Sequence, residues 1–167
     1  MKINYRALSS GLSEREIVPF ALIDNGLRWH VRGYDRARDR FADFVVNRIE
    51  APQLINEEIP EAQTKAADNQ WNRIVDLHIV PHPRLTHPET IAFEYDMQAV
   101  KGDGEDGVML ALQVRAAVAG YVLRRWNVDC SKAHKLDGPE NHLWLKNQQT
   151  LYGVDNLAIA PGYNTEC

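Results

Sequence analysis

The sequence predicts an α+β fold in which a small β-barrel precedes a mixed α+β part. Three observations support this prediction. Residues 1–50 divide into four short segments of alternating apolar and polar residues, separated by turn-forming residues. Residues 74–80 are a further apolar, β-branched run, and residues 107–126 carry apolar side chains at helical spacing. A meander of four short strands tends to curl into a small barrel, and the remainder is typical of an α+β domain.

The first two predicted strands lie at residues 3–7 and 15–23, with a turn at residues 9–11 between them. Pro19 lies inside the second strand and has no N–H to donate to a neighbouring strand. We therefore expect this strand to lie at a sheet edge or to bulge at Pro19. Residues 24–26, Asp-Asn-Gly, tolerate positive φ angles and predict a tight hairpin turn.

The third and fourth predicted strands, residues 27–34 and 40–49, form a hairpin around the polar segment 35–39. At period two, one face of the third strand carries Leu27, Trp29, Val31 and Gly33, and the other carries Arg28, His30, Arg32 and Tyr34. Arginines interleaved with an imidazole and a phenol are suited to phosphate binding and base stacking. The polar face is thus a candidate surface for an anion or a nucleic acid, the alternative being ordinary solvent exposure.

A change of composition follows the predicted meander. Residues 51–69 contain two prolines and an acidic pair, and they predict a connector with one short helix around residues 61–67. The strand at residues 74–80 comes next, and Pro81 ends it.

The rest of the second part predicts two helices and one strand. Thr86, followed by a proline and by Glu89, predicts an N-cap and a helix that runs toward Met97. Apolar residues at three- and four-residue steps predict one long, largely buried helix over residues 107–126. Residues 143–145 read as a last short strand, and the tail after them is irregular.

Composition and charge limit the classes of protein to be considered. The chain of 167 residues is 44% hydrophobic and 25% charged, which is ordinary for a globular protein. Its net charge is −4, yet residues 1–50 hold nine Lys/Arg against seven Asp/Glu, so the first part is the better candidate for binding a polyanion. Two distant cysteines, Cys130 and Cys167, favour a reducing compartment over a disulfide framework. Without a long apolar run or a signal-peptide pattern, we expect a soluble, cytoplasmic protein.

Candidate metal-binding motifs are weak. His78, His82 and His87 are interrupted by two prolines, so they cannot lie one turn apart on a helix. Cys130 and the histidines after it do not complete a ligand set. The acidic segment 103–107 lacks the ligand run of a calcium loop and predicts a solvated turn. We expect no metal.

Signals for catalysis are weaker still. The sequence has no Gly-rich phosphate loop, no nucleophile elbow and no Ser-His-Asp order. A nuclease that uses His142 and Asn147 is the enzymatic alternative, and the carboxylate–histidine geometry that it needs is not indicated. We therefore expect no enzyme, no catalytic residue and no cofactor.

Three short motifs in the first part resemble the WYL domain of bacterial transcriptional regulators. They are Arg15-x3-Pro19, Arg28-Trp29-His30-Val31-Arg32 and Phe41-x2-Phe44-x3-Arg48-Ile49. Trp29-His30-Val31 stands where the family has its name-giving Trp-Tyr-Leu, which lies on a strand of a small Sm/SH3-like barrel. Together with Asp43-Phe44-Val45, these motifs resemble the subgroup of WYL repressors encoded beside phage-defence systems.

The second part resembles the C-terminal dimerisation region of the same subgroup. The matching motifs are Asp68-x2-Trp71, His82-Pro83, Tyr95-x-Met97, Val114-Arg115-x-Ala117, Leu123-Arg124-Arg125-Trp126 and Leu143-Trp144-Leu145. The resemblance implies a WYL barrel at residues 1–52, a connector at residues 53–70 and an α+β dimerisation domain at residues 71–167.

The resemblance implies the ligand-sensing and dimerising part of a regulator, most simply a repressor. A basic pocket in the barrel would bind a nucleotide or oligonucleotide ligand, and the second part would form a homodimer. Such regulators normally carry an N-terminal winged helix-turn-helix, whereas this chain starts at the first strand of the barrel. We therefore expect a fragment that contacts operator DNA only through a winged helix-turn-helix missing from this chain, and no membrane partner. The alternative is a stand-alone nucleic-acid-binding barrel.

By position, the resemblance implies six pocket residues. They are Tyr5, Ser10, Arg15, His30, Arg32 and Arg48. The alternative for Arg48 is a structural salt bridge with Asp43, and the alternative for His30 is a surface histidine that contacts no ligand. Because a phosphate favours the protonated imidazole, His30 in the pocket predicts tighter binding near about pH 6 than near about pH 8.

Overall fold

The protein divides into two compact units, Met1–Asn72 and Arg73–Cys167, and each has its own hydrophobic core. The structure is a computed structural model that describes residues 1–100 and 107–163. The predicted acidic turn at residues 103–107 therefore lies almost wholly outside the described residues. In the part of the chain that is described, no helix is long and apolar enough to cross a membrane. The mixed α/β class, with antiparallel sheets, is confirmed.

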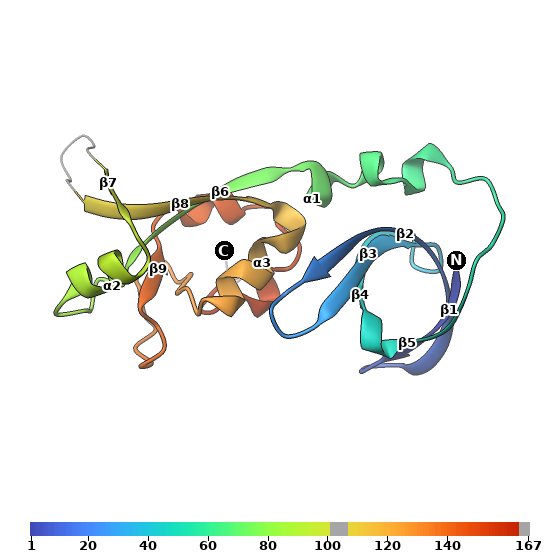
Figure 1. Ribbon diagram of the computed structural model, residues 1–167, viewed down its shortest axis with the longest axis horizontal. Coiled ribbons are helices and arrows are strands. Elements are labelled where there is room, and N and C mark those ends of the chain that lie inside the picture. Colours follow the sequence, from blue (N-terminus) through green and yellow to red (C-terminus); the bar gives the residue numbers. More distant parts are fainter. Residues whose placement is uncertain (101–106, 164–167) are drawn as a thin grey trace. The chain divides into compact units, whose positions relative to one another are not determined.

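The first unit is built on one antiparallel sheet with the strand order β4-β3-β2-β1-β5 (Figure 1). Its strands are β1 (Lys2–Ala7), β2 (Gly11–Asp24), β3 (Trp29–Asp35), β4 (Arg40–Val45) and β5 (Ile49–Gln53). The long strand β2 pairs with β1 through its first half and with β3 through its second half. The register of β2 and β3 shifts between Pro19 and Ala21, so the predicted bulge is confirmed.

The predicted closed barrel is not confirmed, because the described pairing leaves β4 and β5 as the two outer strands of an open sheet. The predicted strand at residues 40–49 is interrupted by the 3₁₀ turn η1 (Val46–Arg48). This turn redirects the chain, and β5 then pairs with β1, with Ile49 opposite Tyr5. The hydroxyl of Tyr5 accepts a hydrogen bond from the Val45 N–H at 3.2 Å, which links β1 to the end of β4 without a ladder.

The connector lies within the first unit and is more ordered than one short helix. Two 3₁₀ turns, η2 (Glu61–Gln63) and η3 (Lys65–Ala67), replace the helix predicted around residues 61–67. The four-residue helix α1 (Asn69–Asn72) ends the unit. Trp71 of α1 packs edge-on against Phe20, the residue at the β2 bulge, with ring centroids 5.7 Å apart. The bulge therefore has a packing role, since it supplies an aromatic contact for the end of the connector.

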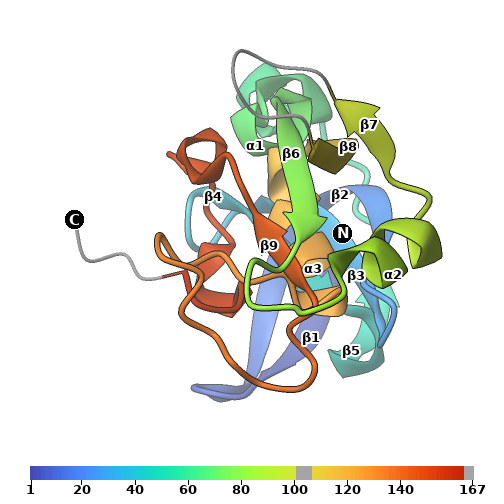
Figure 2. The ribbon, with the colours of Figure 1, turned by 90° about the vertical axis from the view of Figure 1, so that its left-hand side faces the viewer.

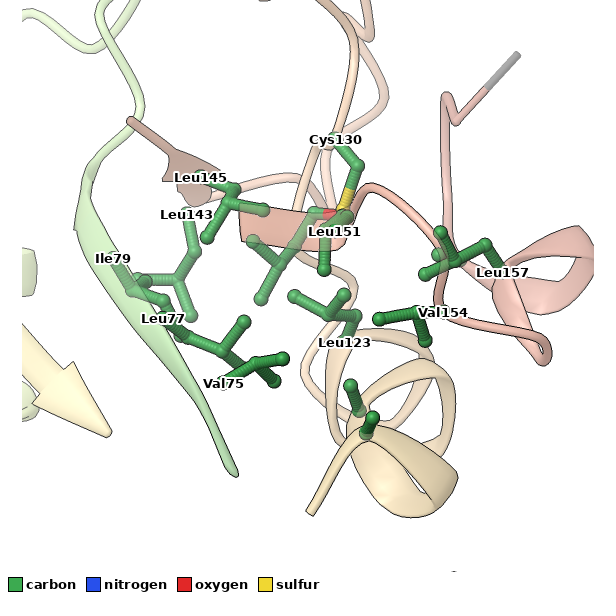
Figure 3. Packing of buried hydrophobic residues seen from close by; sticks show 14 of the residues in the cluster. Val75, Leu77, Ile79, Leu123, Cys130, Leu143, Leu145, Leu151, Val154 and Leu157 are labelled. Carbon is green, nitrogen blue, oxygen red and sulfur yellow. The ribbon is translucent and has the colours of Figure 1, made fainter. Parts of the chain in front are cut away.

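The second unit contains a four-stranded antiparallel sheet with the order β7-β8-β6-β9. Its principal elements are β6 (Ile74–Pro81), α2 (Pro88–Glu94), β7 (Gln98–Val100), β8 (Gly107–Arg115), α3 (Ala116–Arg125), β9 (Leu143–Leu145), η4 (Gln148–Leu151) and η5 (Leu157–Ile159). The strands predicted at residues 74–80 and 143–145 are confirmed. Figure 2 places α3 behind β6 and β9, and Figure 3 shows Val75, Leu77 and Ile79 of β6 gathered on the side toward Leu123 of α3.

The single helix predicted over residues 107–126 is wrong. Residues 107–115 form β8, and the helix begins at Ala116. Val108, Leu110, Leu112 and Val114 alternate at period two and pack against the core, while β8 pairs with β7 near Val108 and with β6 from Leu110 onward. The same apolar residues also fit helical spacing, and the neighbouring strand β6 decides between the two patterns.

The helix predicted from Thr86 begins later than expected. His87 is the N-cap of α2 and makes no side-chain capping hydrogen bond to the helix backbone. Its Nδ1 lies 3.0 Å from a carboxylate oxygen of Glu89 instead. The helix ends at Glu94, three residues before Met97.

Replacing Leu77 by Ala should lower the free energy of unfolding by about 2–5 kcal/mol, because Leu77 is fully buried and the cavity cannot collapse completely. Urea denaturation measures this change. Phe93→Ala in the same unit is the control, since Phe93 is 90% exposed and its loss should cost about 0.5 kcal/mol or less. Equal losses for the two variants would contradict the packing described here.

Candidate ligand-binding site

A pocket of about 270 Å³ opens in the first unit beside the core of the curved sheet. Its walls come from β1, the turn after β1, β2, the end of β3, the β3–β4 turn, β4 and η1. The lining residues are Tyr5, Ala7, Leu8, Ser9, Arg15, Asp35, Arg38, Arg40, Ala42, Asp43, Phe44 and Arg48. Segments far apart in the sequence thus meet here because β2 carries β1 on one side and β3 with β4 on the other.

The pocket carries a surplus of positive charge, with four arginines against two aspartates. Arg15 has a nearby carboxylate, since one guanidinium nitrogen lies 3.8 Å from Asp35. In residues 1–100 and 107–163, no ion pair or side-chain hydrogen bond engages the guanidinium groups of Arg38, Arg40 and Arg48. Guanidinium groups without a protein counter-ion around one hollow are suited to holding an anion.

The structure brings together three of the six residues predicted for the pocket. Tyr5, Arg15 and Arg48 line it. Ser10 does not, although its neighbour Ser9 does. His30 and Arg32 are also absent from its lining, because their side chains occupy the other face of β3.

The alternation predicted for β3 is correct, but the burial of its two faces differs from the expectation. His30 and Arg32 are buried, each with 6% of its surface exposed, whereas Trp29 is 52% exposed. Val31 packs on the core formed by Ile3, Ile17 and Phe44. Both faces of β3 are therefore covered along part of its length, which is why polarity alone did not identify the solvent side.

Arg32 is held by two carboxylates in a buried clamp. Its Nε donates to Oδ2 of Asp68 at 2.6 Å, and one terminal nitrogen donates to Oδ1 of Asp68 at 3.1 Å. The other terminal nitrogen donates to Oδ1 of Asp43 at 2.9 Å. Burial acts to lower the pKa of Arg32, but the hydrogen bonds and charges of Asp68 and Asp43 outweigh it and the pKa is raised. Arg32 therefore remains a cation, and its hydrogen bonds are satisfied within the protein.

The clamp also bears on the alternative for Arg48. The carboxylate of Asp43 pairs with Arg32, and within residues 1–100 and 107–163 no salt bridge joins Arg48 to Asp43. Arg48 remains partly exposed on the pocket side.

His30 is an unsuitable pH sensor for a ligand in this pocket. Burial lowers its pKa, and the attraction of Asp43 only partly opposes that effect. The imidazole is thus favoured in its neutral form, contrary to the protonated state on which the predicted pH dependence rests.

A second arginine ties the earlier part of the connector to the sheet. Arg36 donates from Nε to the side-chain oxygen of Gln63 at 2.9 Å and from a terminal nitrogen to Glu57 at 2.7 Å. Arg32 of β3 thus holds the end of the connector at Asp68. Arg36, four residues later, holds the connector at Glu57 and Gln63. No local pattern indicates these partners, because they lie more than twenty residues away along the chain.

Arg38 and Arg40 were not predicted as site residues. Arg38 belongs to the polar segment 35–39 between the hairpin strands, and Arg40 is the first residue of β4. The three arginines within five residues, Arg36, Arg38 and Arg40, are the available signal in the sequence.

Of the histidines and the cysteine considered in the second unit, His82 and Cys130 are buried. His82 and Asp129 are fully buried, and Nε2 of His82 lies 3.2 Å from Oδ2 of Asp129. Burial raises the pKa of the Cys130 thiol to about 12, so this thiol is unreactive. Among the described residues, no three His, Cys, Asp or Glu side chains are grouped as metal ligands.

Two family models match this chain. Residues 1–54 match the WYL domain, and residues 74–151 match a model described as the BrxR transcriptional regulator, C-terminal dimerization domain. The first match contains the pocket, and the second contains β6 to β9.

Several similar proteins carry the name DNA-binding transcriptional repressor CapW. The protein from Escherichia coli is 27% identical over 143 residues, which are 85% of this chain and 44% of that protein. The protein from Pseudomonas aeruginosa is 31% identical over 139 residues, 83% of this chain and 43% of that one. The protein from Stenotrophomonas maltophilia is 29% identical over 130 residues, 77% and 41% of the two chains. The chain thus spans less than half the length of these curated relatives, whose names describe repressors and not enzymes.

A solved structure of proteasome accessory factor B/C from Arthrobacter aurescens is also similar, at 17% identity and a TM-score of 0.32. It covers 95% of this chain and 23% of the other. A similarity at this level supports no further argument.

Replacing Asp68 by Ala should lower the free energy of unfolding by about 3–5 kcal/mol, because it leaves the buried guanidinium of Arg32 without its main partner. Urea denaturation measures the change. The control is Glu50→Ala, which removes the carboxylate of the exposed Arg6–Glu50 pair and should have little effect. A small loss for Asp68→Ala would contradict the role of the clamp.

An NMR titration of the histidine side chains should place the pKa of His30 below the ordinary value of 6.5. His30 then contributes stability that is present above pH 6.5 and is lost as the pH falls, because the unfolded chain binds the proton more readily. A measured pKa at or above 6.5 would contradict the burial of His30.

Proposed function

Because the chain joins a WYL domain to a BrxR-type C-terminal dimerization domain, we propose that it is the ligand-sensing and dimerising part of a transcriptional repressor. The names of the similar proteins support the repressor part of this proposal. The single observation that carries the sensing part is the pocket within residues 1–54, where Arg38, Arg40 and Arg48 have no protein counter-ion among the described residues.

The proposed ligand is a nucleotide or a short nucleic acid. The arginines supply donors for phosphate oxygens, and the surplus charge favours an anion. Tyr5 and Phe44, which also line the pocket, meet edge to face with ring centroids 5.2 Å apart. They give the pocket an aromatic wall beside its cationic one, which suits a molecule that joins a base to a phosphate better than it suits a bare inorganic ion.

The proposed assembly is a homodimer through the second unit. The match of residues 74–151 to a dimerization domain supports it. Apolar side chains that remain on the surface of this unit, such as Ile74 at 50% exposure, are consistent with a further contact. Operator DNA would be contacted by a winged helix-turn-helix of the full regulator, as the resemblance implies, and the pocket would modulate that contact.

The ligand proposal is tested by a thermal-shift screen of this chain against nucleoside monophosphates, diphosphates, cyclic nucleotides and short single strands. A molecule that binds only the folded state must raise its melting temperature. Failure of every compound at millimolar concentration would contradict the proposal.

For the best ligand of the screen, Arg48→Ala should weaken binding by about tenfold to a hundredfold, because it removes a charge-assisted hydrogen bond to phosphate. Calorimetry measures the affinity. Arg28→Ala is the matched control, since Arg28 is an exposed arginine of the same unit outside the pocket. Equal losses at Arg48 and Arg28 would assign the binding to general surface charge.

Sedimentation of the chain at micromolar concentration should give twice the mass of the 19.0 kDa protomer. The matched segment should suffice for self-association, since it lies wholly within the chain. A clean monomer would contradict the proposed dimer.

A further inference from the structure

The wall of the pocket is joined to the last helix of the first unit by a continuous series of hydrogen bonds. Residues 42–44 of β4 form part of that wall. Asp43, in the middle of this segment, accepts a hydrogen bond from Arg32 at 2.9 Å. Arg32 donates two more to Asp68, at 2.6 and 3.1 Å. The segment 42–44 therefore lines the pocket and, through Asp43, also holds the clamp.

The series continues from Asp68 into α1. Oδ1 of Asp68 accepts hydrogen bonds from the backbone N–H groups of Gln70 and Trp71, at 3.0 and 3.1 Å. These are the two donors at the start of a helix of four residues. Helix α1 ends at Asn72, and Arg73 begins the second unit. The carbonyl of Arg73 in turn accepts from the N–H of Ala116, the first residue of α3.

We propose that Asp43, Arg32 and Asp68 transmit occupancy of the pocket to the junction with the dimerisation unit. This inference rests on the proposed function, because it requires a ligand in the pocket. An anion held against residues 42–44 restrains the strand that carries Asp43. When Asp43 is restrained, Arg32 keeps its two hydrogen bonds to Asp68. Asp68 in turn keeps accepting the two backbone hydrogen bonds at the start of α1. Such a coupled series is stronger when every member is ordered, since each hydrogen bond polarises the next.

The buried clamp is better placed for this role than the other fastening of the connector. The side chains of Arg32 and Asp68 are 7% and 1% exposed, so water does not compete for their hydrogen bonds. Glu57, the partner of Arg36, is 54% exposed, and neither residue lines the pocket. Arg36 also contacts the connector at Glu57 and Gln63, which precede α1 by several residues in the chain.

The test is amide hydrogen exchange of the whole chain, with the exchange rates measured by NMR. The reporters are the amides of Gln70 and Trp71, which donate to Asp68. The internal controls are the amides of Gln63 and Thr64, which lie in the same connector but donate to backbone carbonyls. The probe is the nucleotide or short strand that gives the largest shift in the thermal screen.

Two comparisons test whether Asp43, Arg32 and Asp68 act as a coupled series, which we call the relay. One compares variants with the wild type, and the other compares the wild type with and without the probe. Asp43→Asn should speed exchange at Gln70 and Trp71 by about tenfold, the size expected for a weakened charge-assisted hydrogen bond, with the control amides unchanged. Glu57→Gln, the matched variant at the exposed fastening, should leave the reporters unchanged. In the wild type, saturating probe should slow the reporters more than the control amides.

The outcomes separate this inference from the proposed function. If no probe raises the melting temperature, the proposed function fails. If a probe binds but the reporters do not slow beyond the controls, the relay is refuted while ligand binding stands. Unchanged reporter exchange in Asp43→Asn also refutes the relay, whatever the ligand does.

Discussion

The pairing of Arg32 with Asp43 and Asp68 is the interaction on which the arrangement of the first unit depends. A guanidinium that is 6% exposed must be paired, because an uncompensated buried charge is strongly destabilising. Asp43 supplies a partner from the adjacent strand, and Asp68 supplies one from the connector. The connector is therefore held to the sheet by more than apolar contact. Trp71 adds that contact by packing on Phe20 at the β2 bulge.

The clamp and the pocket share one residue. Asp43 lines the pocket together with Arg48, and its Oδ1 accepts a hydrogen bond from Arg32. Arg32 is buried and bound to carboxylates of the protein, whereas Arg38, Arg40 and Arg48 line the pocket with no protein counter-ion in the described range. The phosphate of a ligand is the partner that we propose for these arginines.

Local patterns predicted much of this structure. The bulge at Pro19 follows from a missing N–H, the alternation along β3 follows from strand geometry, and β6 follows from its β-branched run. The motifs that resemble WYL regulators also led to Tyr5, Arg15 and Arg48, which meet in the pocket.

Two of the failures share a cause, which is that the deciding partner lies far along the chain, and a third comes from a local turn that no residue marks. Arg32 looked like a ligand-binding cation because Asp68, 36 residues away, could not be placed opposite it. Residues 107–115 looked helical because their apolar spacing fits both periods, and pairing with β6 decides for a strand. The barrel was expected to close because the turn η1, which splits the fourth strand, has no proline or glycine to mark it.

A crystal structure of the chain with the strongest ligand of the screen would show directly which arginines bind the phosphate. We expect phosphate oxygens within hydrogen-bond distance of Arg48 or Arg15, with Arg32 still bound to Asp43 and Asp68. A phosphate bound to Arg32 or His30, with the clamp open, would contradict it.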